Sequence, residues 1–142
     1  MSIRRNAGTV QALVRRAGLA SVGAASILAV TMGPAQAASW SSYMTNVGPN
    51  FESSRWYTSG GTHTIQFTGC TSDSSVVNVT LAQDIKLQPD PYYSTAAFTN
   101  CLSGSNAVST GNWGNKGAGD FYFVVNNGGW ARLSVRSLTV TY

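Results

Sequence analysis

The sequence predicts an all-β domain: a small antiparallel β-sandwich of six to seven strands, closed by one disulfide and preceded by a cleaved signal peptide. Apolar and polar residues alternate with a period of two in several short segments, whereas a helical period is weak throughout. Clusters of Gly, Asn, Ser and Pro separate these segments. The chain also has two cysteines, an even number in a short sequence with an export signal. A small closed barrel is the alternative architecture.

The first 37 residues have the layout of a secretory signal peptide. A basic head with four arginines precedes an apolar run from Leu19 to Val30, and the small-residue pattern Ala35-Gln36-Ala37 follows. This run of about 12 residues is shorter than the roughly 20 that a membrane-spanning helix needs. We therefore expect cleavage after Ala37 and secretion into an oxidising, extracellular space.

The chain after Ala37 has no net formal charge, because it keeps five basic and five acidic residues. Its basic residues are scattered, and phosphate contacts need clustered Lys and Arg, so we expect no nucleic-acid partner. Nothing after Ala37 is long and apolar enough to span a bilayer, so we expect no membrane span.

The clearest predicted strands lie between residues 63 and 125. Four segments have strand character, namely 63–68, 76–83, 95–101 (the weakest) and 121–125. Ile65 and Phe67 share one face of the first, and every second residue of the second is apolar. The segment 121–125 is apolar on both faces, which indicates a central strand that is covered on both sides.

The C-terminal part of the chain predicts a hairpin followed by an irregular strand. Asn126-Asn127-Gly128-Gly129 is typical of a tight hairpin, after which we expect a strand from Trp130. Its apolar alternation slips by one residue between Val135 and Leu138. A β-bulge, or a strand that passes from one sheet to the other, would produce this slip.

Two long connections are expected to interrupt the strands. Residues 84–94 contain Pro89-Asp90-Pro91, which cannot lie in a central strand. Residues 103–119 are rich in Gly, Ser and Asn, and we expect a loop with an exposed Trp113.

Cys70 and Cys101 are expected to form a structural disulfide. Each is preceded by a Phe-Thr pair and followed by a Ser-rich turn, as expected for two strand ends tied together. Closing a loop of about 30 residues should contribute roughly 3–4 kcal/mol to stability.

Residues 38–61 are rich in aromatic side chains but show no steady alternation of apolar and polar residues. We therefore expect them to form a segment distinct from the β-sandwich domain at 62–142. One interpretation is an edge segment folded onto the domain. The other is an N-terminal arm that another protein accepts by strand addition or by insertion into a cleft.

The sequence carries no catalytic signature, and we expect no enzyme, no metal and no cofactor. His63 is the one histidine, and we expect it near the surface, without the motifs of a triad or a zinc site around it. The acidic residues have turn or cap positions, although a calcium site built from several of them is an alternative. A small hydrolase that uses His63 or two carboxylates is the least favoured hypothesis.

The expected activity is binding through aromatic side chains. The candidate partner-binding residues are Trp40, Tyr43, Tyr92, Tyr93 and Trp113. Trp56 and Trp130 are expected in the core.

The favoured function is a secreted, non-enzymatic module that binds one or more extracellular proteins, and this class includes inhibitors of secreted proteases. The alternative is a carbohydrate- or cell-wall-binding domain, in which Tyr92 and Trp113 stack on glycans.

The basic head, the Ala-Gln-Ala site and the neutral, Gly/Thr-rich remainder resemble small secreted β-sandwich proteins of high-GC Gram-positive bacteria. Together with the aromatic segment from Trp40 to Tyr57 and the single cysteine pair, they are also similar to the strut subunit of secreted umbrella-like toxin particles. That resemblance implies an assembly or adaptor subunit of an extracellular toxin complex. Such a subunit joins a toxin-bearing to a lectin-bearing subunit, and its neighbour holds its N-terminal segment.

Overall fold

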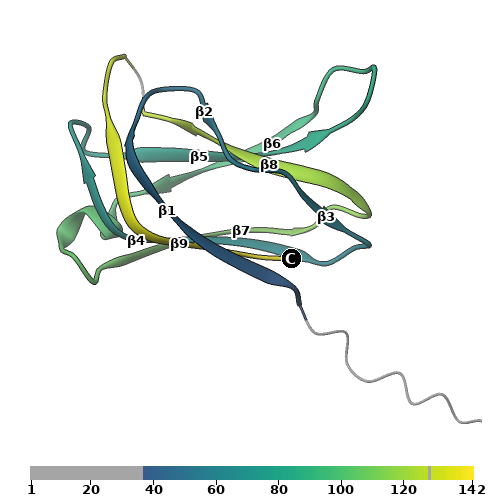
Figure 1. Cartoon of the computed structure of the whole chain (residues 1–142), viewed down its shortest axis with the longest axis horizontal. Helices are drawn as coiled ribbons and strands as arrows, with labels where there is room; N and C mark the ends of the chain where they lie inside the picture. Colours follow the sequence, from purple (N-terminus) through teal and green to yellow (C-terminus); the bar gives the residue numbers. More distant parts are fainter. Residues whose placement is uncertain (1–36, 128) are drawn as a thin grey trace, which may run out of the picture. The chain divides into compact units, whose positions relative to one another are not determined.

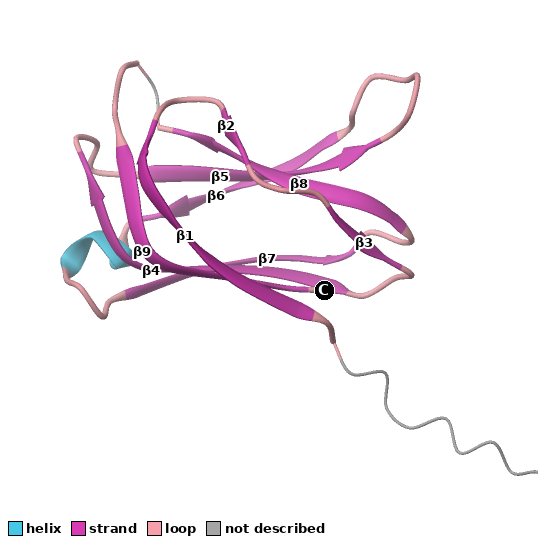
Figure 2. Cartoon of the chain, in the orientation of Figure 1, coloured by secondary structure: helices cyan, strands magenta, loops and turns pink. Residues whose placement is uncertain are grey.

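The computed structural model describes residues 37–127 and 129–142, which form two antiparallel sheets (Figures 1 and 2). The predicted all-β fold with one disulfide is therefore confirmed. The predicted signal peptide, apart from Ala37, lies outside the described residues. Within the described ranges, no helix is long and apolar enough to cross a membrane.

The described ranges contain nine strands, more than the six to seven expected. Two of them, β2 and β3, are only two and three residues long. The first sheet has the order β1 (Ser39–Val47), β9 (Leu133–Thr141), β4 (Thr62–Ser72) and β7 (Val108–Asn115). The second has the order β2 (Phe51–Glu52), β8 (Gly119–Asn126), β5 (Val77–Asp84) and β6 (Tyr92–Phe98), and β3 (Trp56–Thr58) also pairs with β8. A 3-10 helix, η1 (Asn100–Ser103), precedes β7.

The core fills the space between the sheets. Ile65 and Phe67 of β4 are fully buried, as the alternation predicts. The Phe67 ring lies edge-on to Phe98 and Phe123 of the opposite sheet, with centroids 5.0 and 5.6 Å apart. These cross-sheet contacts remove large aromatic surfaces from water, which supplies the main force that holds the two layers together.

The strand predicted to be covered on both faces is β8. Phe121 and Phe123 face the core. Tyr122 faces outward yet is only 1% exposed. The guanidinium of Arg55 lies 4.1 Å from the centroid of its ring, and its hydroxyl donates a 2.8 Å hydrogen bond to Asp90. The outer cover of β8 is therefore made by side chains and a loop.

The slip of alternation in the last strand is a β-bulge. The buried positions of β9 are Leu133, Val135, Leu138 and Val140, which include a step of three. At that step the pairing of β1 with β9 shifts by one residue. The strand begins at Leu133, and Trp130 in the preceding turn is 92% exposed, so the expectation that Trp130 lies in the core is wrong.

The expected loop at 103–119 is also wrong over much of its length, because it contains β7. Trp113 lies on the inward face of β7, is 5% exposed, and donates a 2.6 Å hydrogen bond from Nε1 to the Ser94 carbonyl. Its ring lies against Gly111, where an added Cβ would come within 2.5 Å of it. The expectation that Trp113 is exposed is therefore wrong, because the lack of a side chain at Gly111 lets the ring fold inward.

The disulfide joins β4 to η1. Cys70 and Cys101 are bonded, with their Cα atoms 5.0 Å apart. The Cys101 amide also donates a 2.9 Å hydrogen bond to Ser109 Oγ at the start of β7. The predicted disulfide is confirmed, and it fixes η1 against the first sheet.

Candidate functional site

Residues 38–61 form three strands in the two sheets. β1 lies at the edge of the first sheet beside β9, and the chain then crosses to β2 and β3, which pair with β8 (Figure 1). Trp40 of β1 is half-buried against Trp56 of β3, with ring centroids 5.9 Å apart. The segment is therefore attached to both sheets by backbone pairing and is joined across them by this ring contact.

One side of β1 is open. β1 pairs with β9 alone among the strands of the described residues. Ala38 and Tyr142 exchange two backbone hydrogen bonds of 2.8 Å, so they form a hydrogen-bonded pair of the antiparallel ladder. Hydrogen-bonded pairs recur at every second residue, so the backbone N–H and C=O groups of Trp40 and Ser42 also point toward β9. Those of Ser39 and Ser41 point away from the sheet.

The residues of β1 do not block this edge. Natural edge strands are usually protected by Lys, Pro or bulges, but Ser39–Val47 contains neither a charged residue nor proline. Its two register shifts lie beyond Ser42. Residues 39–42 therefore form a regular edge, and the adjacent Tyr43 is 71% exposed. We call residues 39–43 the β1 edge.

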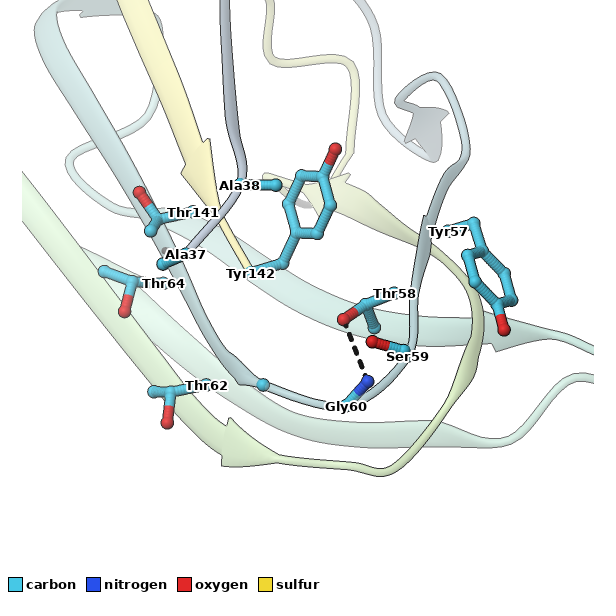
Figure 3. Close-up of a pocket in the computed structure, with 11 residues that line it drawn as sticks. Ala37, Ala38, Tyr57, Thr58, Ser59, Gly60, Thr62, Thr64, Thr141 and Tyr142 are labelled. Atoms are coloured by element: carbon cyan, nitrogen blue, oxygen red, sulfur yellow. Dashed lines mark hydrogen bonds between the residues drawn. The ribbon is translucent and has the colours of Figure 1, made fainter. Parts of the chain in front are cut away.

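A hollow of about 580 Å³ lies where β1 begins (Figure 3). Thr62 and Thr64 of β4 and Thr141 of β9 line one part of it, and Tyr57 and the turn after β3 line another (Figure 3). Ala38 also contributes to the lining. The lining offers hydroxyls, backbone groups and tyrosine rings, which suits an uncharged side chain of a ligand better than acid–base chemistry.

His63 is fully buried, so the expectation that it lies near the surface is wrong. It is on the same inward face of β4 as Ile65 and Phe67. Its Nδ1 accepts a 3.4 Å hydrogen bond from Trp56 Nε1, its ring centroid is 4.3 Å from that of Phe121, and its Nε2 is buried without a partner among the described residues. Burial, with a smaller effect of the positive charge of Lys116, lowers the pKa of His63.

We expect the lowered pKa of His63 to make the protein less stable in mild acid. In the unfolded chain His63 has about the ordinary pKa of 6.5, whereas in the folded chain its pKa is lower. The contribution of neutral His63 to stability is therefore fully present above pH 6.5 and is lost progressively below it, because the unfolded state then binds a proton more readily. Thermal denaturation measured between about pH 7.5 and 5 should show a falling Tm, since carboxylates stay mostly ionised in this window. His63→Phe should flatten the slope. A wild-type Tm that is constant over this range, or an unchanged slope in the variant, would contradict this account.

The acidic residues hold local structure. Arg55 bridges Glu52 and Asp84, at 2.8 and 3.1 Å. Asp90 accepts hydrogen bonds from the Ile85 amide and the Tyr122 hydroxyl, and these two contacts lower the pKa of Asp90. In the part of the chain that the structure describes, no group of three or more His, Cys, Asp or Glu side chains is arranged to hold a metal ion.

The predicted partner-binding residues do not form one surface. Trp40 and Tyr43 lie on β1, whereas Tyr92 and Tyr93 lie on β6, which is packed beside β7 at the other edge of the first sheet. Tyr92 is 60% exposed, but the Tyr93 hydroxyl is directed to Gln83 Oε1, 2.9 Å away.

The chain matches no family model, and comparisons with curated proteins and with solved structures find no similar protein. The sequence patterns also gave no indication of the outward amides of Ser39 and Ser41 or of the exposed Tyr57, since these depend on which strands pair. The β1 edge and the hollow beside it are therefore the features of the molecule that bear most directly on function.

Proposed function

We propose that this protein is a secreted, non-enzymatic interaction module that binds an extracellular protein by adding one of that protein's strands to β1. The observation that carries this proposal is the open β1 edge, where Ser39 and Ser41 direct backbone donors and acceptors outward from a strand without charge or proline. In strand addition, main-chain hydrogen bonds provide affinity and pockets for alternate side chains provide specificity.

The surroundings of the β1 edge indicate what kind of strand it would accept. Among the described residues, the lining of the hollow beside Ala38 has no charged side chain, which favours a segment with uncharged side chains. Exposed Tyr43 offers a broad amphipathic ring at the other end of the edge. Because 38–61 is already paired within the domain, the partner adds to β1 from outside and does not have to extract an arm.

The role of an adaptor subunit in an extracellular toxin complex is one form of this proposal, and inhibition of a secreted protease is another. Both need an exposed, extended segment that a second protein can recognise through its backbone. The β1 edge supplies such a segment to either class of partner.

Substituting Ser41→Pro should strongly weaken partner binding while leaving the fold nearly intact. The Ser41 amide points away from β9, so proline removes an outward donor and breaks no backbone hydrogen bond of the sheet. It also removes the exposed hydrogen bond between the Ser41 and Thr139 hydroxyls. The wild-type protein is immobilised, exposed to the culture medium of its source organism, and the retained proteins are identified by mass spectrometry. We expect one partner whose affinity falls at least about tenfold with Ser41→Pro.

The matched control is Tyr92→Ala, an exposed substitution on the far edge strand, which should retain the same partner. Near-equal Tm values for the variants and the wild type would show that folding is preserved. Equal retention by Ser41→Pro and wild type, or no retained protein at all, would refute binding at the β1 edge.

A further inference from the structure

A second, independent surface lies on the outer face of the second sheet. It has a hollow of about 360 Å³, and the described residues that line it all carry amide or hydroxyl side chains: Asn78, Thr80, Thr95, Asn126 and Asn127. The hydroxyls of Thr80 and Thr95 bond to each other at 2.7 Å across β5 and β6. The hollow is therefore polar and uncharged.

An exposed aromatic ring stands on the same face, nearer the start of β6. In register, Ala82 of β5 lies between Tyr122 of β8 and Tyr92 of β6, while Thr80 pairs with Thr95 in the neighbouring row. Tyr122 is covered, but Tyr92 is 60% exposed. Strands are about 4.8 Å apart and alternate residues about 6.8 Å apart, so an extended ligand of two or more rings can reach both features.

Asn127 lies in the lining of the hollow with its side-chain amide group buried. The residue is 7% exposed, and neither its amide nitrogen nor its amide oxygen has a hydrogen-bond partner among the described residues. Buried polar groups are nearly always paired, and leaving them unpaired is costly. Their burial keeps both Asn127 atoms from direct contact with a ligand, so the match to a polyhydroxylated ligand rests on the amides and hydroxyls of the rest of the lining, which donate and accept hydrogen bonds as sugar hydroxyls do.

We propose that this face binds a neutral oligosaccharide. The amides and hydroxyls of the hollow would bond sugar hydroxyls, and the Tyr92 ring would stack on the apolar face of a neighbouring sugar. The uncharged lining gives no preference for phosphate, sulfate or carboxylate groups. This site is separate from the β1 edge, because it lies on the other sheet and uses none of the same residues.

The test measures the binding of cellohexaose, chitohexaose and maltohexaose to the wild-type protein by isothermal titration calorimetry. We expect one of the three to bind, and we expect Tyr92→Ala and Asn78→Ala each to raise its Kd about tenfold. Tyr43→Ala on the β1 edge is the matched control and should leave the Kd unchanged. Unchanged Tm values for all three variants would show that the fold is retained.

Three results would overturn the proposal: no binding of any of the three sugars, equal affinity of the site variants and the wild type, or a loss of affinity in Tyr43→Ala as large as in Tyr92→Ala. The outcome is separable from that of the proposed function. Ser41→Pro should bind the sugar normally, and Asn78→Ala should retain the protein partner.

Discussion

Removing the Cys70–Cys101 disulfide is expected to lower the free energy of unfolding by about 3–4 kcal/mol. For a domain of this size, that corresponds to a fall in Tm of roughly 15–25 °C. The two cysteines are 31 residues apart. The segment between them contains β5 and β6, which are two neighbouring strands of the second sheet. The cross-link therefore restricts a large part of the unfolded chain, which raises the free energy of the unfolded state.

Circular dichroism melting of Cys70→Ala/Cys101→Ala beside oxidised wild type measures this effect. Both cysteines are buried, so the double variant also loses some packing. Wild type melted in excess reductant keeps the sulfur atoms and separates the two contributions. A double variant and a reduced wild type that both melt within a few degrees of the oxidised protein would show that the cross-link contributes little.

Gly69→Ala should be the next most damaging change, at roughly 2–4 kcal/mol. Gly69 lies in β4 with φ +64°, and its amide donates a 3.0 Å hydrogen bond to the Ala107 carbonyl. A Cβ here would be 2.5 Å from the Ser105 carbonyl oxygen, which is backbone and has little freedom to move. The substitution therefore adds a steric clash to an unfavourable conformation.

Gly114→Ala is the matched control. Gly114 has nearly the same φ, +68°, but no atom of the described residues lies within 4 Å of an added Cβ. It should lose only about 1 kcal/mol, because it pays the conformational cost without the clash. Urea denaturation of both variants measures the difference. If Gly69→Ala were no less stable than Gly114→Ala, the close approach of the Ser105 carbonyl to β4 would be contradicted.

The strands that sequence patterns located are those whose inward positions are large and apolar. Alternation at Ile65 and Phe67 identified β4 and, continued back by two residues, also places His63 in the core. The same rule failed for β7, which alternates just as regularly between buried and exposed positions. Two of its buried positions are Ser109, with a small polar side chain, and Gly111, which has none, so neither carries a hydrophobic signal.

The positions of the tryptophans required tertiary information. Trp113 has a Gly-rich neighbourhood, which indicates a loop, yet Gly111 provides the space into which its ring folds. Trp130 follows a glycine pair and was expected to begin a strand, but the Arg132 amide is bonded to Asp73 before β9 begins. Burial in both cases depends on contacts with distant segments, which local periodicity does not contain.

The open β1 edge could not be predicted from the sequence for a similar reason. The aromatic content of 38–61 marked the segment as unusual, and Tyr43 is exposed as expected of a partner-binding residue. The outward direction of the Ser39 and Ser41 amides follows from the pairing of β1 with β9. Ser41 and Thr139, which face each other in that pair, are 98 residues apart.

Amide hydrogen exchange, measured by NMR with and without the purified partner, tests strand addition at β1 most directly. In the free protein the outward amides of Ser39 and Ser41 should exchange rapidly, whereas those of Trp40 and Ser42 are protected by β9. Addition of the partner should slow exchange at Ser39 and Ser41 and leave the other two unchanged. A tight complex in which Ser39 and Ser41 exchange as rapidly as before would contradict the account.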